Sequence, residues 1–175
     1  MMNARQFLNA IDLNSKPRVY LMCGIAGAGK TTLANKLVEK GFIRLSIDEC
    51  IWAQFGKYGI DYQPAQYPEL QKEAEHQLEQ ELITYLKQQQ SLVIDYSFWK
   101  HSNREKYKAL IESYGVECII LFLKVDYKTL KSRLKNRSSR FDANAAFPIT
   151  EEILDQYYTG FQEPVNEGEI IILPD

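Results

Sequence analysis

A glycine-rich stretch, Gly24-Ile25-Ala26-Gly27-Ala28-Gly29-Lys30-Thr31, constrains the fold of this chain more than any other feature. It follows an apolar run over residues 19–23 that is typical of a buried strand. It precedes a helix-like pattern of Leu33, Ala34, Leu37 and Val38. The order of strand, G-x-x-x-x-G-K-[ST] loop and helix is that of a phosphate-binding loop. The sequence therefore predicts a site for a nucleoside triphosphate.

The residue types of this loop suit phosphate chemistry. Glycines let backbone N–H groups approach phosphate oxygens closely, and a helix start adds unpaired N–H groups and a positive dipole end. We expect Lys30 to reach the β- and γ-phosphates and the Thr31 hydroxyl to hold Mg²⁺. ATP and Mg²⁺ are thus the expected cofactors, although the motif does not separate ATP from GTP. The nucleotide contacts are predicted at Gly24, Ala26, Gly27, Ala28, Gly29, Lys30, Thr31 and Thr32.

A chance match is the alternative to a phosphate-binding loop. A glycine-rich turn with an unrelated lysine would satisfy the four fixed positions only about once in a hundred such chains or less, given ordinary glycine usage. The flanking strand and helix patterns make chance rarer still. The functional reading is therefore preferred.

The composition is that of an ordinary globular protein. The 175 residues suffice for one α/β domain with a substantial core, with 45% hydrophobic and 25% charged residues. A net charge of -2 argues against electrostatic binding of long nucleic acid. Three cysteines without a C-x-x-C pair and two distant histidines do not suggest a zinc site. Without a signal peptide or a membrane-length apolar run, a cytoplasmic location and no membrane partner are expected.

Apolar runs and glycine or proline stops organise the remainder of the chain. We expect residues 1–17 to form an N-terminal extension with a short helix, and residues 18–175 to form one domain with a lid at about 126–149. The predicted fold is α/β, with a parallel five-stranded sheet, helices on both faces and a small lid, as in the three-layer fold of P-loop NTPases. Its strands are expected at 19–23, 42–47, 91–95, 116–124 and 169–173.

Two aspartates follow predicted strands. In an open parallel sheet, ligands bind outside the carboxyl ends of the strands, so Asp48 and Asp95 should lie near the phosphates. Asp48 is a candidate catalytic base, with helix N-capping as its structural alternative, and Ser46 with Glu49 also fits a capping box. Asp95 is the expected partner of the loop and would hold Mg²⁺ directly or through water. Which aspartate is the base stays open at this stage.

A helix predicted over residues 127–137 carries two arginines beside an apolar stripe. At 100° per residue, Arg133 and Arg137 lie with Leu130 and Leu134, whereas the lysines face the opposite way. Arginine forks bind phosphate oxygens well, which favours a lid that closes over transferring phosphate. Ordinary surface ion pairs are the alternative. Arg140 would continue the series if the helix extends.

Three further segments give weaker signals. Residues 52–68 are rich in aromatic residues, glycine and proline, and either a substrate-facing loop or additional core fits them equally well. A long helix over about 69–89 shows one apolar face and is assigned no chemistry. Ser102 with Glu105 predicts the capped start of another helix.

Taken together, these motifs resemble those of the small P-loop kinases of the polynucleotide-kinase, zeta-toxin and chloramphenicol-phosphotransferase type. The resemblance covers about residues 18–173 and is most specific at the phosphate loop. Its other elements are the strand ending in Asp48, Asp95 with Ser97-Phe98 behind it, Arg104, the Arg133–Arg137 spacing, and Phe161-x-x-Pro164-x-x-Glu167.

The resemblance implies a kinase mechanism. The aspartate matching Asp48 accepts the proton of a substrate hydroxyl, while Lys30, Arg133 and Arg137 offset the charge of the transition state. One position departs from the family: many relatives have an arginine three residues after the aspartate, where this chain has Ile51. That change weakens the case for an anionic acceptor and favours an uncharged or amine-bearing small molecule.

Three functions remain after the sequence is read. The first is an ATP-dependent kinase acting on a hydroxyl of a small molecule, as a monomer or homodimer. The second is a kinase of nucleic-acid ends or nucleotide sugars, and the third is an ATP-hydrolysing switch that acts through a protein partner. The lid arginines and the acid at Asp48 favour transfer over switching.

Overall fold

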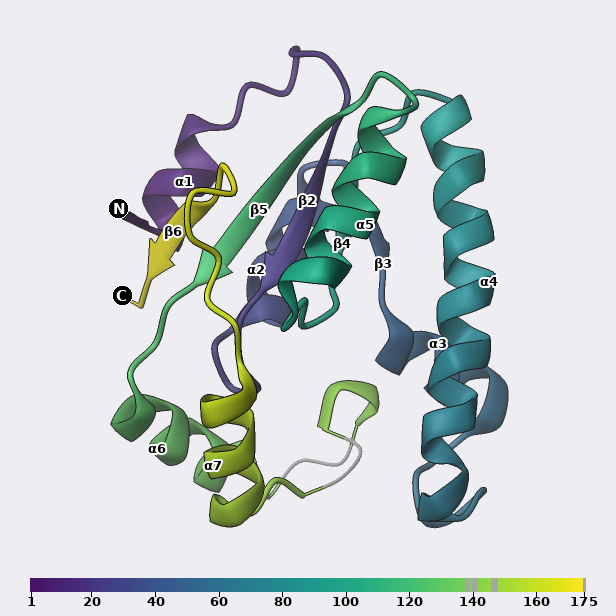
Figure 1. Cartoon of the computed structure of the whole chain (residues 1–175), viewed down its shortest axis with the longest axis vertical. Helices are drawn as coiled ribbons and strands as arrows, with labels where there is room; N and C mark the ends of the chain where they lie inside the picture. The colour runs from purple at the N-terminus through teal and green to yellow at the C-terminus, as the bar shows by residue number, and fades with distance from the viewer. Residues whose placement is uncertain (138, 140–141, 146–147, 175) are drawn as a thin grey trace.

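A parallel β-sheet forms the centre of the molecule, which we describe from a computed structural model (Figure 1). The structure describes residues 1–137, 139, 142–145 and 148–174. Within them the sheet order is β1-β6-β5-β2-β4-β3, with every neighbouring pair parallel. The strands are β1 (Met2–Asn3), β2 (Arg18–Cys23), β3 (Ile43–Leu45), β4 (Leu92–Ile94), β5 (Glu117–Leu123) and β6 (Ile170–Leu173).

Helices connect the strands and cover both faces of the sheet (Figure 1). They are α1 (Ala4–Ala10), α2 (Lys30–Glu39), α3 (Ile47–Phe55), α4 (Tyr67–Lys87), α5 (His101–Glu112), α6 (Tyr127–Arg137) and α7 (Glu151–Gly160), with short 3-10 turns η1 (Pro64–Gln66) and η2 (Ala143–Ala145). The predicted three-layer α/β fold is confirmed. None of the helices in the described ranges has the length and apolar character needed to span a membrane.

The alternation of side chains along β2 divides the core into two halves. Tyr20 and Met22 pack with residues of α1, α2 and α6 on one face. Val19, Leu21 and Cys23 pack with residues of α4 and α5 on the other. All five side chains are essentially inaccessible to solvent, as expected for a central strand of a parallel sheet that is covered on both sides.

The prediction of five strands was wrong by one. The additional strand, β1, pairs with β6 at the edge of the sheet, with Met2 opposite Ile172. Helix α1 follows at once, and Asn3 and Gln6 form a reciprocal capping box at its start. Phe7 and Leu8 of this helix are buried in the core. The first residues therefore extend the sheet. A strand of two residues is too short to produce a recognisable sequence pattern, so it was not predicted.

The carboxyl ends of β2, β3 and β4 bring the candidate residues together. β2 leads into the glycine-rich loop, β3 leads into α3 with Asp48 in its first turn, and Asp95 directly follows β4. Strands β3 and β4 are shorter than predicted, but β4 pairs with β2 and β3 pairs with β4, so their ends lie at the same edge of the sheet as the loop. The lid elements α6, η2 and α7 lie at this same end of the molecule (Figure 1).

Candidate active site

A large cleft opens at the carboxyl end of the sheet. Its volume is about 1270 Å³, above the ~300–1,000 Å³ usual for a single ligand, so it has room for more than one small molecule. The predicted site residues that line it are Ala26, Gly27, Ala28, Gly29, Lys30, Thr31, Thr32, Asp48, Asp95, Arg133 and Arg137. Gly24 is outside this lining: its N–H donates to the Ser97 carbonyl at 3.2 Å and ties the loop to the next strand end.

The glycine-rich loop adopts a backbone that glycine alone accommodates readily. Gly29 has φ of 102° and stands at the N-terminal cap of α2. No side chain among the described residues caps this helix, so its first N–H groups are free to bind phosphate oxygens. Gly27 has φ of 85°, and a Cβ there would lie 3.2 Å from Leu134 of α6. The loop is thus packed directly against the lid helix.

Lys30 is held on the loop itself. Its ammonium donates to the carbonyl oxygens of Gly24 at 2.8 Å and Ile25 at 3.0 Å. Burial lowers the pKa of Lys30, and the nearby carboxylates of Asp95 and Asp48 act in the opposite direction. A lysine in this position presents a cation at the loop, where triphosphate oxygens would bind.

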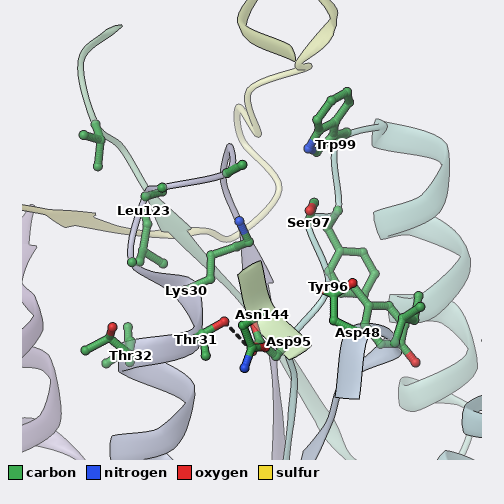
Figure 2. Close-up of a pocket in the computed structure, with 18 of the residues that line it drawn as sticks. Lys30, Thr31, Thr32, Asp48, Asp95, Tyr96, Ser97, Trp99, Leu123 and Asn144 are labelled. Carbon is green, nitrogen blue, oxygen red and sulfur yellow. Dashed lines mark hydrogen bonds between the residues drawn. The ribbon is translucent and has the colours of Figure 1, made fainter. Parts of the chain in front are cut away.

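Thr31 and Asp95 form a pair of oxygen ligands suited to Mg²⁺. The Thr31 hydroxyl donates to Asp95 Oδ2 at 3.1 Å, and Figure 2 shows the two side chains meeting below Lys30. Mg²⁺ usually takes one or two protein oxygens and completes its shell with phosphates and water. The described residues hold no cluster of three or more His, Cys, Asp or Glu side chains able to bind a metal alone. The pair therefore fits a metal that arrives with the nucleotide.

Asp48 faces the cleft from the start of α3. Ser46 is the helix N-cap and its side chain accepts from the Glu49 N–H, so the capping role considered for Asp48 belongs to Ser46. Asp48 Oδ1 accepts a hydrogen bond from the Tyr67 hydroxyl at 3.0 Å. Burial raises the pKa of Asp48, whereas the Tyr67 hydrogen bond opposes that rise. A half-buried carboxylate with a raised pKa is a suitable proton acceptor.

The two arginines of α6 contact the glycine-rich loop and η2, respectively. Arg133 Nη1 donates to the carbonyl oxygens of Gly27 at 3.3 Å and Ala28 at 3.2 Å. Arg137 donates to the Asn144 carbonyl in η2 and also lines the cleft. Both predicted arginines thus lie at the cleft, while Arg140 lies outside the described residues. The predicted lid range of 126–149 likewise includes residues that are not described.

Sequence reasoning missed one wall of the cleft. Helix α4, predicted to have no chemistry, presents Tyr67, Gln71 and Glu75 to the cleft at successive turns. Glu75 accepts from the Tyr107 hydroxyl at 3.2 Å. The available signal was the four-residue spacing of Tyr67, Gln71 and Glu75, which places them along one line of the helix beside its apolar residues. Of the aromatic segment 52–68, Tyr67 lines the cleft, and Tyr58 and Tyr62 pack around it.

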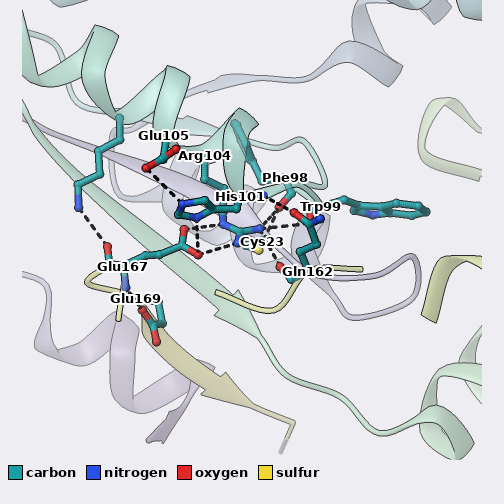
Figure 3. A network of polar contacts seen from close by, with 10 residues as sticks. Cys23, Phe98, Trp99, His101, Arg104, Glu105, Gln162, Glu167 and Glu169 are labelled. Atoms are coloured by element: carbon teal, nitrogen blue, oxygen red, sulfur yellow. Dashed lines mark hydrogen bonds and ion pairs between the residues drawn. The ribbon is translucent and has the colours of Figure 1, made fainter. Parts of the chain in front are cut away.

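A buried arginine holds the segment that follows Asp95 in the chain, residues 96–100 (Figure 3). Arg104, only 1% exposed, binds both carboxylate oxygens of Glu167 at 2.7 Å. Its Nη1 also donates to the carbonyls of Phe98 and Trp99, at 2.8 and 3.3 Å, and of Gln162, at 2.9 Å. Hydrogen bonding to Arg104 lowers the pKa of Glu167. These contacts explain why Arg104 and Glu167 occur in one sequence pattern.

Comparison with known proteins adds to this geometry. The family model AAA_33, described as an AAA domain, matches residues 19–164. No curated protein matches the sequence significantly.

Several solved structures share the fold. A protein of Chloroflexus aurantiacus j-10-fl, provisionally assigned as a kinase, has a TM-score of 0.71 at 19% identity, covering 91% of this chain and 88% of that one. A gluconokinase from Sinorhizobium meliloti 1021 has a TM-score of 0.56 at 14% identity, with 91% and 84% covered. The Mycobacterium tuberculosis APS kinase CysC, solved with AMPPNP and APS, has a TM-score of 0.53 at 17% identity, with 91% and 90% covered.

Proposed function

The chain belongs to the AAA domain family whose model matches residues 19–164, and we propose that this member is an ATP-dependent kinase that phosphorylates a hydroxyl of a small molecule. The family match and the fold confirm the resemblance to small P-loop kinases drawn from the motifs. The observation that best supports the proposal is the presence of Asp48 in the same cleft as the phosphate loop and both lid arginines.

In the proposed reaction, charge around the transferring phosphate is offset from two sides. Lys30 and the N–H groups at the start of α2 bind phosphate oxygens from below, and Arg133 and Arg137 bind them from the lid. Preorganised donors of this kind usually supply the largest share of catalysis. Mg²⁺ held near Thr31 and Asp95 would neutralise charge on the β- and γ-phosphates.

Asp48 is the proposed base. Asp95 Oδ2 already accepts hydrogen bonds from Thr31 at 3.1 Å and twice from Arg44, at 2.6 and 3.0 Å. That oxygen is therefore less able to accept a proton from a substrate. Asp48 has one neutral donor, Tyr67, and a pKa raised by burial. It would orient the acceptor hydroxyl and take its proton as the oxygen attacks the γ-phosphate, an effect typically worth ~10²–10⁴-fold.

The acceptor wall favours a neutral or amine-bearing molecule. The wall near Asp48 carries the Asp48 and Glu75 carboxylates and the Gln71 amide beside the aromatic ring of Tyr96, and Lys100 also lines the cleft. Ile51, at the position where many relatives have arginine, is 2% exposed and does not line the cleft. Carboxylates beside aromatic rings suit hydroxyl and ammonium groups and repel phosphate.

Trp99 offers one more group for an acceptor. Its indole Nε1 is buried, and none of the described residues accepts a hydrogen bond from it. The ring stacks edge-on against Tyr157, with centroids 4.6 Å apart, and lines the cleft beside Ser97 (Figure 2). An unpaired buried donor costs ~1–3 kcal/mol, which a hydroxyl oxygen of a bound acceptor would recover.

A transfer assay with γ-labelled ATP tests the proposal. Wild-type protein should label one or more members of a panel of alcohols, sugars and amino sugars, and Asp48→Asn should abolish labelling while retaining ATP binding. Asp12→Asn, an exposed aspartate near the N-terminus, is the matched control and should behave as wild type. Efficient labelling of RNA or DNA ends with no small alcohol labelled would refute the small-molecule acceptor. ATP hydrolysis without transfer to any compound would favour the switch.

A further inference from the structure

Arg44, in the middle of β3, is the counter-ion of the proposed metal carboxylate. Its Nη2 and Nε donate to Asp95 Oδ2 at 2.6 and 3.0 Å. The Asp95 side chain is 3% exposed and that of Arg44 13%, so the pair is largely shielded from water. A carboxylate this buried requires a partner, because an unpaired charge there is very unfavourable.

The same guanidinium also contacts the lid. Arg44 Nη2 donates to Asn144 Oδ1 in η2 at 3.0 Å, and Asn144 Nδ2 donates to Glu49 Oε1 at 2.8 Å. The backbone carbonyl of Asn144 accepts from Arg137. One side chain therefore joins the metal side of the cleft to the segment that holds a lid arginine.

Arg44 has a second carboxylate within reach. Its Nη1 lies 3.5 Å from Glu49 Oε1, a long contact beside the short ones to Asp95. The Glu49 side chain is 46% exposed, so its pair with Arg44 is weaker than the Asp95 pair as long as Arg44 alone neutralises Asp95. A divalent cation at Thr31 and Asp95 would compensate that charge and repel the guanidinium. The balance between the two carboxylates would then favour Glu49.

We propose that Arg44 is a positioning residue that moves from Asp95 toward Glu49 when Mg²⁺ binds, and so couples metal binding to the placement of η2. The proposal rests on the proposed function only in assigning Mg²⁺ to Thr31 and Asp95. Because Arg44 Nη2 already contacts Asn144, the shift strengthens its contacts to the lid as those to Asp95 weaken. Arg137, hydrogen-bonded to Asn144, would be set in place in the same step.

The test is the Mg²⁺ dependence of nucleotide binding, measured by calorimetry with a non-hydrolysable ATP analogue. Arg44→Met leaves Asp95 without its counter-ion, so half-maximal binding should occur at about tenfold lower Mg²⁺, from the Coulomb interaction lost at close range. Glu49→Gln removes the alternative partner and should raise the Mg²⁺ requirement severalfold. Opposite shifts are therefore the expected result. Removing a cation and removing an anion near the metal shift the Mg²⁺ requirement in opposite directions by charge alone, so hydrogen exchange at η2 is the measurement that tests the coupling itself.

Hydrogen exchange at residues 143–145 provides a second measurement. Mg²⁺ with the analogue should protect this segment in the wild type, and this protection should be lost in both Arg44→Met and Asn144→Ala. Lys106→Met and Glu79→Gln break a surface ion pair on α5 and α4 and are the matched controls, with no shift expected. Glu49→Gln alters an exposed side chain and should lose the same protection, so it tests the coupling if Arg44→Met does not fold.

Each unfavourable result has a distinct meaning. Same-direction shifts in Arg44→Met and Glu49→Gln, or protection of residues 143–145 that persists in Arg44→Met, would overturn the coupling while leaving the kinase proposal intact. Nucleotide binding that needs no Mg²⁺ in the wild type would overturn both the metal assignment and the coupling. Failure to find an acceptor affects neither measurement, since no phosphate is transferred.

Discussion

Replacing Arg104 by methionine should destabilise the protein severely. Arg104 is the largest fully buried side chain and makes two bonds to Glu167 and three to backbone carbonyls. Methionine preserves much of the side-chain volume but removes every hydrogen-bond donor. The Glu167 carboxylate, whose side chain is only 12% exposed, then loses the Arg104 cation that neutralises it. Removing one partner of a buried ion pair typically costs ~3–5 kcal/mol. At about 2–4 °C per kcal/mol for a domain of this size, the melting temperature should fall by about 6–20 °C.

Urea unfolding followed by far-ultraviolet circular dichroism measures this loss. Lys106→Met, which breaks an ion pair with Glu79 at the surface, is the matched control and should cost under about 1 kcal/mol. In the double variant Arg104→Met/Glu167→Met no charge is left unpaired, so part of the stability should return. A loss under about 1 kcal/mol for Arg104→Met would refute the reasoning, because it would mean that the buried pair contributes no more than a surface pair.

The pH dependence gives an independent check. Hydrogen bonding to Arg104 lowers the pKa of Glu167 in the folded state. A lowered folded-state pKa contributes stability above the unfolded-state value, ~4.3 for glutamate, and that contribution is lost as pH falls through the folded-state pKa. The difference between wild type and Arg104→Met should therefore be constant near neutral pH and shrink below about pH 4.

Three further variants test the site. Lys30→Ala should abolish ATP turnover, because it removes the cation at the β- and γ-phosphates, and steady-state phosphate release measures it. Asp48→Asn should retain the affinity for ATP in calorimetry and lower phosphate transfer by ~10²–10⁴-fold, the usual effect of a lost general base. Tyr67→Phe removes the hydrogen bond that lowers the pKa of Asp48, so the acid limb of the transfer rate should move to higher pH. An unmoved limb would show that Asp48 does not titrate in the reaction.

The strand ends and the loop were predictable because short-range patterns determine them. The glycine-rich loop needs particular residue types at fixed spacing, and the apolar runs before Asp48 and Asp95 mark buried strands. Topology then brings the two acids to the loop without any further information. The orientation of Arg133 and Arg137 toward the protein was predictable in the same way, because helical periodicity places them beside Leu130 and Leu134, which are buried.

Long-range contacts set the features that the sequence patterns did not reveal. Ser102 and Glu105 predicted a capping box, but α5 begins at His101, and its His101 N–H donates to the Gln162 side chain at 2.9 Å, from 61 residues away. Arg44 gave no signal, since its partners Asp95 and Asn144 are 51 and 100 residues away. A polar residue whose partner lies on another element carries no local periodicity that would identify it.

The division of the cleft between elements has a consequence for specificity. In the proposed kinase the groups assigned to phosphate transfer lie on strand ends and on α6, whereas Tyr67, Gln71 and Glu75 line the cleft from α4. The core of α4 is formed by Leu78, Leu82 and Leu86. The exposed Gln71 can change without disturbing it, whereas Glu75 is tied to the buried Tyr107. Acceptor choice in this fold can therefore diverge on one helix while nucleotide binding is preserved. The missing arginine at position 51 fits that view, because recognition of the acceptor would have moved from α3 to α4.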